Sequence, residues 1–210
     1  RAGGRFAAIG ALERAVDIAQ RILGEKAVDL EQRLEAHLIA GEAMIAIGRA
    51  EEVARGLDEI EQIARAASEH RGLARVLLLQ GTAEYRAGRR EASRRHLEAA
   101  RGLSAEIGDA RLETRALLNL ALAMARDRSP EAQAMLREAA ARAESAGDDE
   151  TRAAAWLNLA RLQQGSAAAA DLLASIRSAA QAAQGLPESY GKVRLLTGIG
   201  ELAVRLARDR

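Results

Sequence analysis

The sequence predicts an all-α protein, and three observations lead to that prediction. Hydrophobic residues make up 49% of the 210 residues and aromatic residues only 2%, while alanine, leucine and arginine, which favour helices, are abundant. Both prolines, in Ser129-Pro130 and Pro187-Glu188, stand where helices are expected to begin. Gly108-Asp109 and Gly147-Asp148 each join a helix-ending glycine to a residue that caps the next helix. We therefore expect antiparallel helix pairs joined by short turns.

A period of about 40 residues runs through the chain. Small residues recur inside apolar helical segments at Gly41, Gly81, Ala121, Ala160 and Gly200. Glycine or alanine at such positions lets neighbouring helices approach closely. A second segment follows each of the first four, with apolar or small residues on one helical face. These face residues are Val53, Leu57 and Ile60; Ala92, His96 and Ala99; Ala132, Leu136 and Ala139; and Leu172, Ile176 and Ala179.

The expected helices follow from this period in chain order. Residues 4–23 form a second helix without a first. Four pairs follow, and they are 29–48 with 50–69, 71–87 with 89–106, 109–126 with 129–146, and 149–164 with 167–184. Residues 188–208 form a first helix without a second, and Leu120 and Leu159 are expected in the core.

The unpaired end helices bear on domain organisation. We expect one repeat domain over residues 1–210, with about five repeats that are partial at both ends. Together with the absence of an initiator methionine, this pattern indicates a fragment of a longer protein. A trimmed chain whose end helices simply cap it is the alternative.

Several short motifs resemble the tetratricopeptide repeat. Trp156-x2-Leu159-Ala160, Ala92-x3-His96 and Ala132-x3-Leu136 are similar to its Trp-x2-Leu-Gly-x2-Tyr and Ala-x3-Phe signature. Because the period exceeds the usual value of about 34, the chain looks like the long-period repeats of large bacterial signalling ATPases, transcription activators and kinases. The resemblance implies a right-handed superhelical solenoid with a concave groove formed mainly by first helices.

The same resemblance implies which residues line the groove. They are Leu38, Arg75, Leu78, Tyr85, Arg86, Arg115, Leu118, Leu122, Arg126, Leu157 and Arg161. A leucine stripe edged with arginine suits an amphipathic helix or an extended apolar segment with acidic flanks. Asn119 and Asn158 match an asparagine that clamps a peptide carboxylate in some members, but leucine replaces the clamping lysine. The alternative is that the leucine stripe packs inside the solenoid.

Other function classes find little support in the sequence. A net charge of +1 argues against nucleic-acid binding, although Arg86, Arg89, Arg90, Arg94 and Arg95 form a basic stretch. The chain has no cysteine and three scattered histidines, so neither a metal nor a cofactor is expected. No phosphate-binding loop or nucleophile elbow is found, so no enzyme activity is expected. Without a long apolar run or a signal peptide, no membrane contact and a cytoplasmic location are expected.

The sequence therefore predicts a scaffold that binds a protein or peptide, as the sensor or docking region of a larger cytoplasmic signalling protein. Self-association through the two open terminal helices is the alternative. A helical enzyme or small-molecule receptor is the third hypothesis, which would require an enclosed pocket with perturbed titratable groups.

Overall fold

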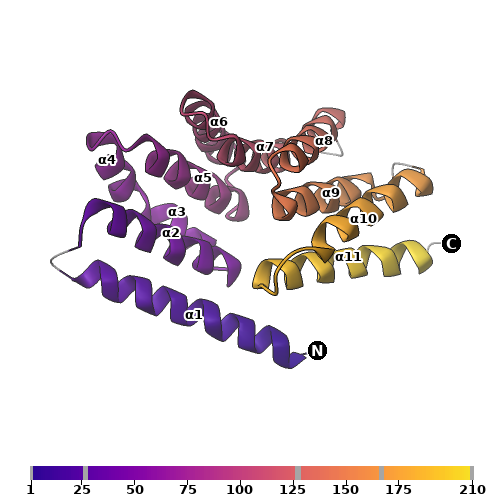
Figure 1. Cartoon of the computed structure of the whole chain (residues 1–210), viewed down its shortest axis with the longest axis horizontal. Coiled ribbons are helices and arrows are strands. Elements are labelled where there is room, and N and C mark those ends of the chain that lie inside the picture. Colours follow the sequence, from indigo (N-terminus) through magenta and orange to yellow (C-terminus); the bar gives the residue numbers. More distant parts are fainter. Residues whose placement is uncertain (1, 26–27, 126–128, 166–167, 209–210) are drawn as a thin grey trace. The chain divides into compact units, whose positions relative to one another are not determined.

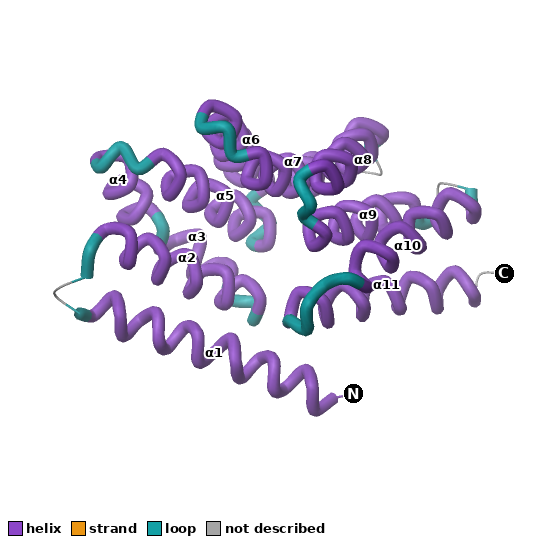
Figure 2. The backbone as a smooth tube through the Cα atoms, viewed as in Figure 1, coloured by secondary structure: helices purple, strands orange, loops and turns teal. Residues whose placement is uncertain are grey.

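The computed structural model describes residues 2–25, 28–125, 129–165 and 168–208, with side chains in the first helix described from Ile9 onward. Every regular element within these ranges is an α-helix, as the composition predicts (Figure 2). The helices follow one another as consecutive packed pairs. By its internal contacts the chain divides into two compact units, Arg1–Leu112 and Glu113–Arg210.

In the first unit, α1 packs against α2 and α5 packs against α6 as antiparallel neighbours (Figure 1). Helix α2 also contacts α3 and α5. The helices of this unit are α1 (Ala2–Gly24), α2 (Leu30–Ala46), α3 (Ala50–Gly56), α4 (Asp58–Ala66), α5 (His70–Arg86), α6 (Arg90–Glu106) and the start of α7 (Ala110–Met124).

The second unit holds the rest of α7 together with α8 (Pro130–Ser145), α9 (Asp149–Gln163), α10 (Ala169–Gln184) and α11 (Tyr190–Arg208). Helix α9 packs against α8, α10 and α11. Leu159 and Leu120 are 1% and 4% exposed, which confirms their expected place in the core. Trp156 is half-buried and packs against apolar clusters on both sides of α9.

The turns between helices depend on residues with positive φ. Gly48, Gly88, Gly108 and Gly147 take this conformation, which glycine adopts without a Cβ clash, and Ser68 takes it at the end of α4. The following residue then donates its backbone N–H to the carbonyl five positions earlier, with N···O distances of 2.8 to 3.1 Å after Ser68, Gly108 and Gly147. This hydrogen bond is typical of a Schellman turn and ends the helix at a fixed residue.

A side-chain cap begins the first helix of each repeat, namely α2, α5, α7 and α9. Asp29, Asp109 and Asp148 accept a hydrogen bond from the backbone N–H three residues later, at 2.8, 3.0 and 3.0 Å. Glu69 accepts the equivalent bond from Gly72. The carboxylates satisfy N–H groups that have no partner inside the helix and complement the helix dipole. Turn and cap together explain why the Gly-Asp pairs mark helix boundaries as predicted.

The two prolines differ in their positions. Pro130 occupies the first turn of α8 and Ser129 caps it, as predicted. Pro187 lies before α11 rather than in its first turn, because Ser189 Oγ accepts the cap bond from Lys192 N at 3.1 Å. Helix α11 therefore begins at Tyr190, two residues later than predicted.

The second helices bury rows of residues spaced by four, three and four. The rows are Val53, Leu57, Ile60 and Ala64; Ser93, Leu97, Ala100 and Ser104; Ala132, Leu136, Ala139 and Ala143; and Leu172, Ile176, Ala179 and Ala183. Three of them contain the predicted residues. In α6 the predicted row was wrong by one position, because Ser93 is buried by donating to the Gly81 carbonyl at 2.7 Å.

The predicted helix over residues 50–69 is also interrupted. It divides at Leu57 into α3 and α4. Gly56 is a weak helix former, and Asp58, Glu59 and Glu61 favour a new helix N-terminus just after it. Leu57 itself stays 3% exposed, so the break leaves the packing row intact.

The small residues of the first helices have the expected packing role in four repeats. A Cβ added to Gly41 would lie 2.5 Å from Leu79 Cδ2, and one added to Gly81 would lie 2.5 Å from Leu97 Cγ. Ala121 and Ala160 are fully buried. Gly200 differs from the prediction, since a Cβ there would meet no atom within 4 Å. Gly200 itself is exposed, as is Leu196 one turn earlier on the same face of α11.

Candidate functional site

Helix α5 carries a basic row on the face that the resemblance assigned to binding. Arg71, Arg75, Thr82 and Arg86 lie on one face because they are separated by four, seven and four residues. The Arg71 side chain is 73% exposed, and Arg86 is exposed as well. The Thr82 hydroxyl donates to the Leu78 carbonyl at 2.7 Å, so it belongs to the helix rather than to the surface.

Helix α2 carries an acidic row with the same spacing, at Glu31, Glu35 and Glu42. The two rows meet where both Arg75 Nη atoms donate to the Glu35 carboxylate, with Nη2 3.1 Å from Oε2. This hydrogen bond lowers the pKa of Glu35 and raises the pKa of Arg75. Because the side chains are 45% and 37% exposed, solvent screening limits the pair to at most about 1 kcal/mol.

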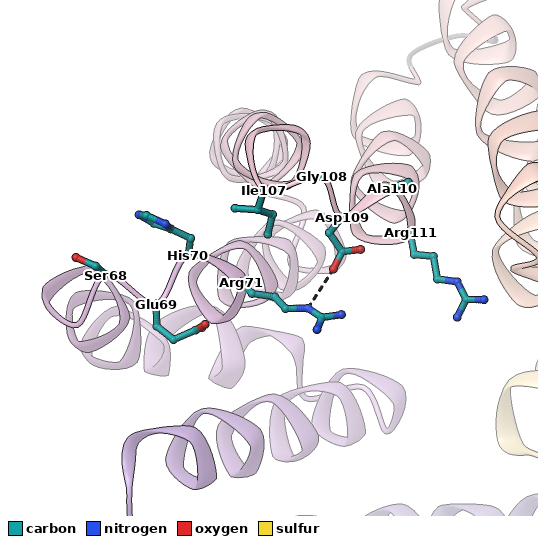
Figure 3. Close-up of a pocket in the computed structure, with 9 residues that line it drawn as sticks. All are labelled: Ser68, Glu69, His70, Arg71, Ile107, Gly108, Asp109, Ala110 and Arg111. Atoms are coloured by element: carbon teal, nitrogen blue, oxygen red, sulfur yellow. Dashed lines mark hydrogen bonds and ion pairs between the residues drawn. The ribbon is translucent and has the colours of Figure 1, made fainter.

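A hollow of about 620 Å³ lies between the start of α5 and the start of α7. Its lining residues are Ser68, Glu69, His70, Arg71, Ile107, Gly108, Asp109, Ala110 and Arg111 (Figure 3). Arg71 Nε donates to Asp109 Oδ2 at 3.1 Å, while Asp109 Oδ1 caps α7. The Asp109 carboxylate therefore binds both the Arg71 guanidinium and the start of α7, and most of the Arg71 side chain still faces solvent.

The predicted leucine stripe is buried. Leu38, Leu78, Leu118 and Leu157 are 2%, 5%, 7% and 4% exposed. Leu118 lies in a core cluster with Leu136 and Leu159, and Leu157 lies in one with α10 and α11 residues. These four leucines do not form an accessible apolar stripe. They pack in the interior, which was the alternative to a binding role. The first helices carry apolar residues on more than one face, and neighbouring helices bury each of these faces.

The remaining predicted groove residues fall into three groups. Tyr85 and Leu122 are half-buried, whereas Arg115 and Arg161 are exposed. Arg126 lies outside the described residues. Asn158 Nδ2 donates to the Ala154 carbonyl at 2.9 Å, and its Oδ1 accepts from Arg161 at 3.2 Å. The Asn158 amide is thus bound within α9 rather than presented as a clamp.

The residues around the hollow are not among the predicted groove residues. Arg71 and Arg111 are 40 residues apart, as are Glu69 and Asp109, so the repeat period itself contains the signal. The small and apolar residues that mark the period do not include these charged positions. The pairing of Arg71 with Asp109 depends on the turns at Ser68 and Gly108, which set where α5 and α7 begin. The spacing of residues along the sequence does not show this.

Two arginines of the basic stretch have acidic partners nearby. In the basic stretch, Arg89 pairs with Glu84 and Arg94 lies 3.4 Å from Glu98. Burial lowers the pKa of His37. His70 is the exposed first residue of α5. Among the described residues no group of histidine and acidic side chains has the arrangement of a metal site. None of the described helices has the length and apolar character needed to span a membrane.

Comparison with other proteins adds no family to this description. Neither the protein-family models nor the curated proteins contain a match to this chain.

Proposed function

We propose that this chain is a repeat scaffold that binds a protein or peptide, and that the arginine row of α5 receives acidic residues of the partner. The supporting observation is the Arg71 guanidinium, which Asp109 fixes at the edge of the hollow while 73% of its side chain remains exposed. An arginine held in this way can form paired hydrogen bonds to a carboxylate without first being ordered.

The partner's apolar contacts come from the half-buried residues at the same face, because the leucines beneath are covered. Tyr85 on α5 and Ile45 on α2 are half-buried and stand at corresponding positions 40 residues apart. A tyrosine offers a large contact area with few rotatable bonds, which suits a binding surface. The partner is therefore a short amphipathic segment with apolar residues on one face and acidic residues beside them.

The architectural part of the proposal is a right-handed superhelix of the tetratricopeptide type. It rests on the 40-residue period, the packed consecutive pairs and the sequence resemblance. By the same resemblance, we propose that the chain serves as the sensor or docking region of a larger cytoplasmic signalling protein. The proposal includes no chemical reaction.

A fluorescein-labelled peptide of about 18 residues, or five helical turns, tests the proposal. The probe carries leucines on one face and glutamates on both sides, and its control has glutamine in place of every glutamate. Fluorescence anisotropy is expected to show tighter binding of the glutamate peptide, with weaker binding in about 0.5 M NaCl because salt screens the charges. The double variant R71Q/R86Q is expected to lose roughly tenfold in affinity.

The matched control is R137Q/R177Q, which removes two exposed arginines from the second helices α8 and α10. Both variants lose the same charge, so a general effect of net charge weakens both equally. Equal affinities of the two double variants, or equal binding of the two peptides by the unmodified chain, contradict the proposed role of the α5 row.

A further inference from the structure

Two arginines that lie one turn apart on α5 are held by different carboxylates. Arg71 donates through Nε to Asp109 at the start of α7, at 3.1 Å, and this bond leaves both of its Nη groups outside it. Arg75 donates through both Nη groups to the Glu35 carboxylate of α2. The Arg71 side chain is 73% exposed and the Arg75 side chain only 37%. The two arginines therefore differ in what they offer to a partner.

The Arg75 guanidinium already has the contact that a partner's carboxylate would make. Arginine binds a carboxylate most strongly when two parallel N–H groups donate to the two oxygens. Glu35 has this arrangement, since one Nη group of Arg75 donates to each of its oxygens. The hydrogen bonding raises the pKa of Arg75, and the charges of Glu42 and Glu69 act in the same direction. A carboxylate arriving at Arg75 must therefore displace Glu35 and is repelled by two further carboxylates.

The other two arginines of the row are not occupied in this way. Arg86 is exposed at the last residue of α5. Among the residues that the structure describes, no carboxylate binds both Nη groups of Arg71 or of Arg86. These two arginines are 15 residues apart, which is about 22 Å along the helix axis. The positive charges that a partner can reach therefore lie at the two ends of α5.

We propose that Glu35 determines the specificity of the α5 row, because it occupies Arg75 and so favours partners with acidic groups at the two ends of the docked segment. The inference rests on the proposed function, in which Arg71 and Arg86 receive the partner's carboxylates. An acidic residue opposite Arg75 adds no affinity, since Glu35 competes for the same guanidinium. The preferred partner is an amphipathic segment with two acidic groups about 22 Å apart and a neutral residue opposite Arg75.

Two fluorescein-labelled helical peptides test the inference by fluorescence anisotropy. The first has leucines on one face and one glutamate near each end, with the separation of Arg71 and Arg86. The second has a further glutamate one turn in from each end, so that one of these lies opposite Arg75 whichever way the peptide runs. The unmodified chain is expected to bind the two peptides with affinities that differ by less than about twofold. Glu35→Gln is expected to bind the second peptide about fivefold more tightly than the first.

Glu201→Gln is the matched control, because it removes one exposed carboxylate from α11 and changes the net charge by the same amount. This variant is expected to bind the two peptides like the unmodified chain. The double variant Glu35→Gln/Arg75→Gln is expected to lose the preference for the second peptide, which would assign the gain to the Arg75 guanidinium. Circular dichroism verifies that each variant is folded.

The same peptides separate this inference from the proposed function. If R71Q/R86Q binds the first peptide as tightly as the unmodified chain does, or if no chain binds either peptide, the proposed function and the inference both fail. If R71Q/R86Q loses affinity but Glu35→Gln shows no more preference than the unmodified chain, only the role of Glu35 is overturned. A preference that survives in Glu35→Gln/Arg75→Gln also overturns it, because the gain then does not come from Arg75.

Discussion

Helices α5 and α11 carry corresponding positions of the same repeat, yet one face is buried and the other is exposed. Leu77 of α5 is 3% exposed and Gly81 lies against Leu97 of α6, while Leu196 of α11 is 43% exposed and Gly200 lies in open space. Both faces are apolar, so the sequence pattern alone does not distinguish them. The comparison shows that the repeat specifies a surface that requires a cover, and that the neighbouring helix decides whether the cover is present.

Truncating the leucine of each face gives the largest expected difference. Leu77→Ala is expected to cost about 2 to 5 kcal/mol in the free energy of unfolding, because it leaves a cavity in a well-packed site. Leu196→Ala is expected to change it by less than about 0.5 kcal/mol in dilute protein. Urea unfolding at low concentration measures both, and equal losses would remove the distinction between the faces.

Adding a methyl group to the glycine of each face is expected to change stability in opposite directions. In Gly81→Ala the new Cβ overlaps Leu97, and overpacking is expected to cost about 1 to 3 kcal/mol. In Gly200→Ala nothing lies within 4 Å, so the higher helix propensity of alanine is expected to add up to about 1 kcal/mol. Thermal unfolding of the two variants compares them, and a stabilised Gly81→Ala would contradict the close packing of α5 and α6.

A titratable residue at the corresponding position of α2 allows a pH-dependent test of how well this face is protected from solvent. His37 occupies the position of Leu77 in its own repeat, and burial lowers its pKa, opposed by the Glu59 carboxylate and assisted by the Arg33 charge. The unfolded chain takes up a proton near pH 6.5 while the folded chain does not. Stability is therefore expected to fall as the pH drops from about 6.5 toward the lowered folded pKa.

The variant His37→Gln lacks this titration, so its stability is expected to change less over that interval. Urea unfolding at about pH 7.5 and pH 5.5 measures the difference between the two chains. The same pH slope in both proteins would show that His37 is not protected from protonation by the fold.

The ion pair between α2 and α5 is expected to give the smallest effect. Arg75→Gln is expected to cost at most about 1 kcal/mol near pH 7, since both side chains are partly exposed. Hydrogen bonding to Arg75 lowers the pKa of Glu35, so this contribution is present above the unfolded value of about 4.3 and is lost as the pH falls through the folded pKa. An NMR titration is expected to show the Glu35 pKa rising in the variant. An unchanged Glu35 pKa would contradict the pair.

Helix positions could be predicted from the sequence because their causes are local. The turn glycines, the acidic caps and the row in each second helix lie within a few residues of the boundaries they determine. The displaced row of α6 has a non-local cause, because Ser93 is buried by reaching the carbonyl of Gly81. The later start of α11 has a local cause, because Ser189 caps the helix and leaves Pro187 in front of it.

The candidate site was less accessible to sequence reasoning. The resemblance placed Arg75, Leu78 and Arg86 on one face of α5, which the helix confirms, but it did not indicate that Leu78 is covered. Burial depends on which helices pack against α5, and spacing along one helix contains no such information. Arg71 could have been found by following the charged residues through the 40-residue period.

Hydrogen exchange in dilute protein compares the covered and the open face in one experiment. The amides of α5 are expected to exchange more slowly than those of α11, because α6 lies against Gly81 while the face of α11 around Leu196 and Gly200 is exposed. Equal exchange rates in α5 and α11 would contradict the assignment of α11 as an open packing face.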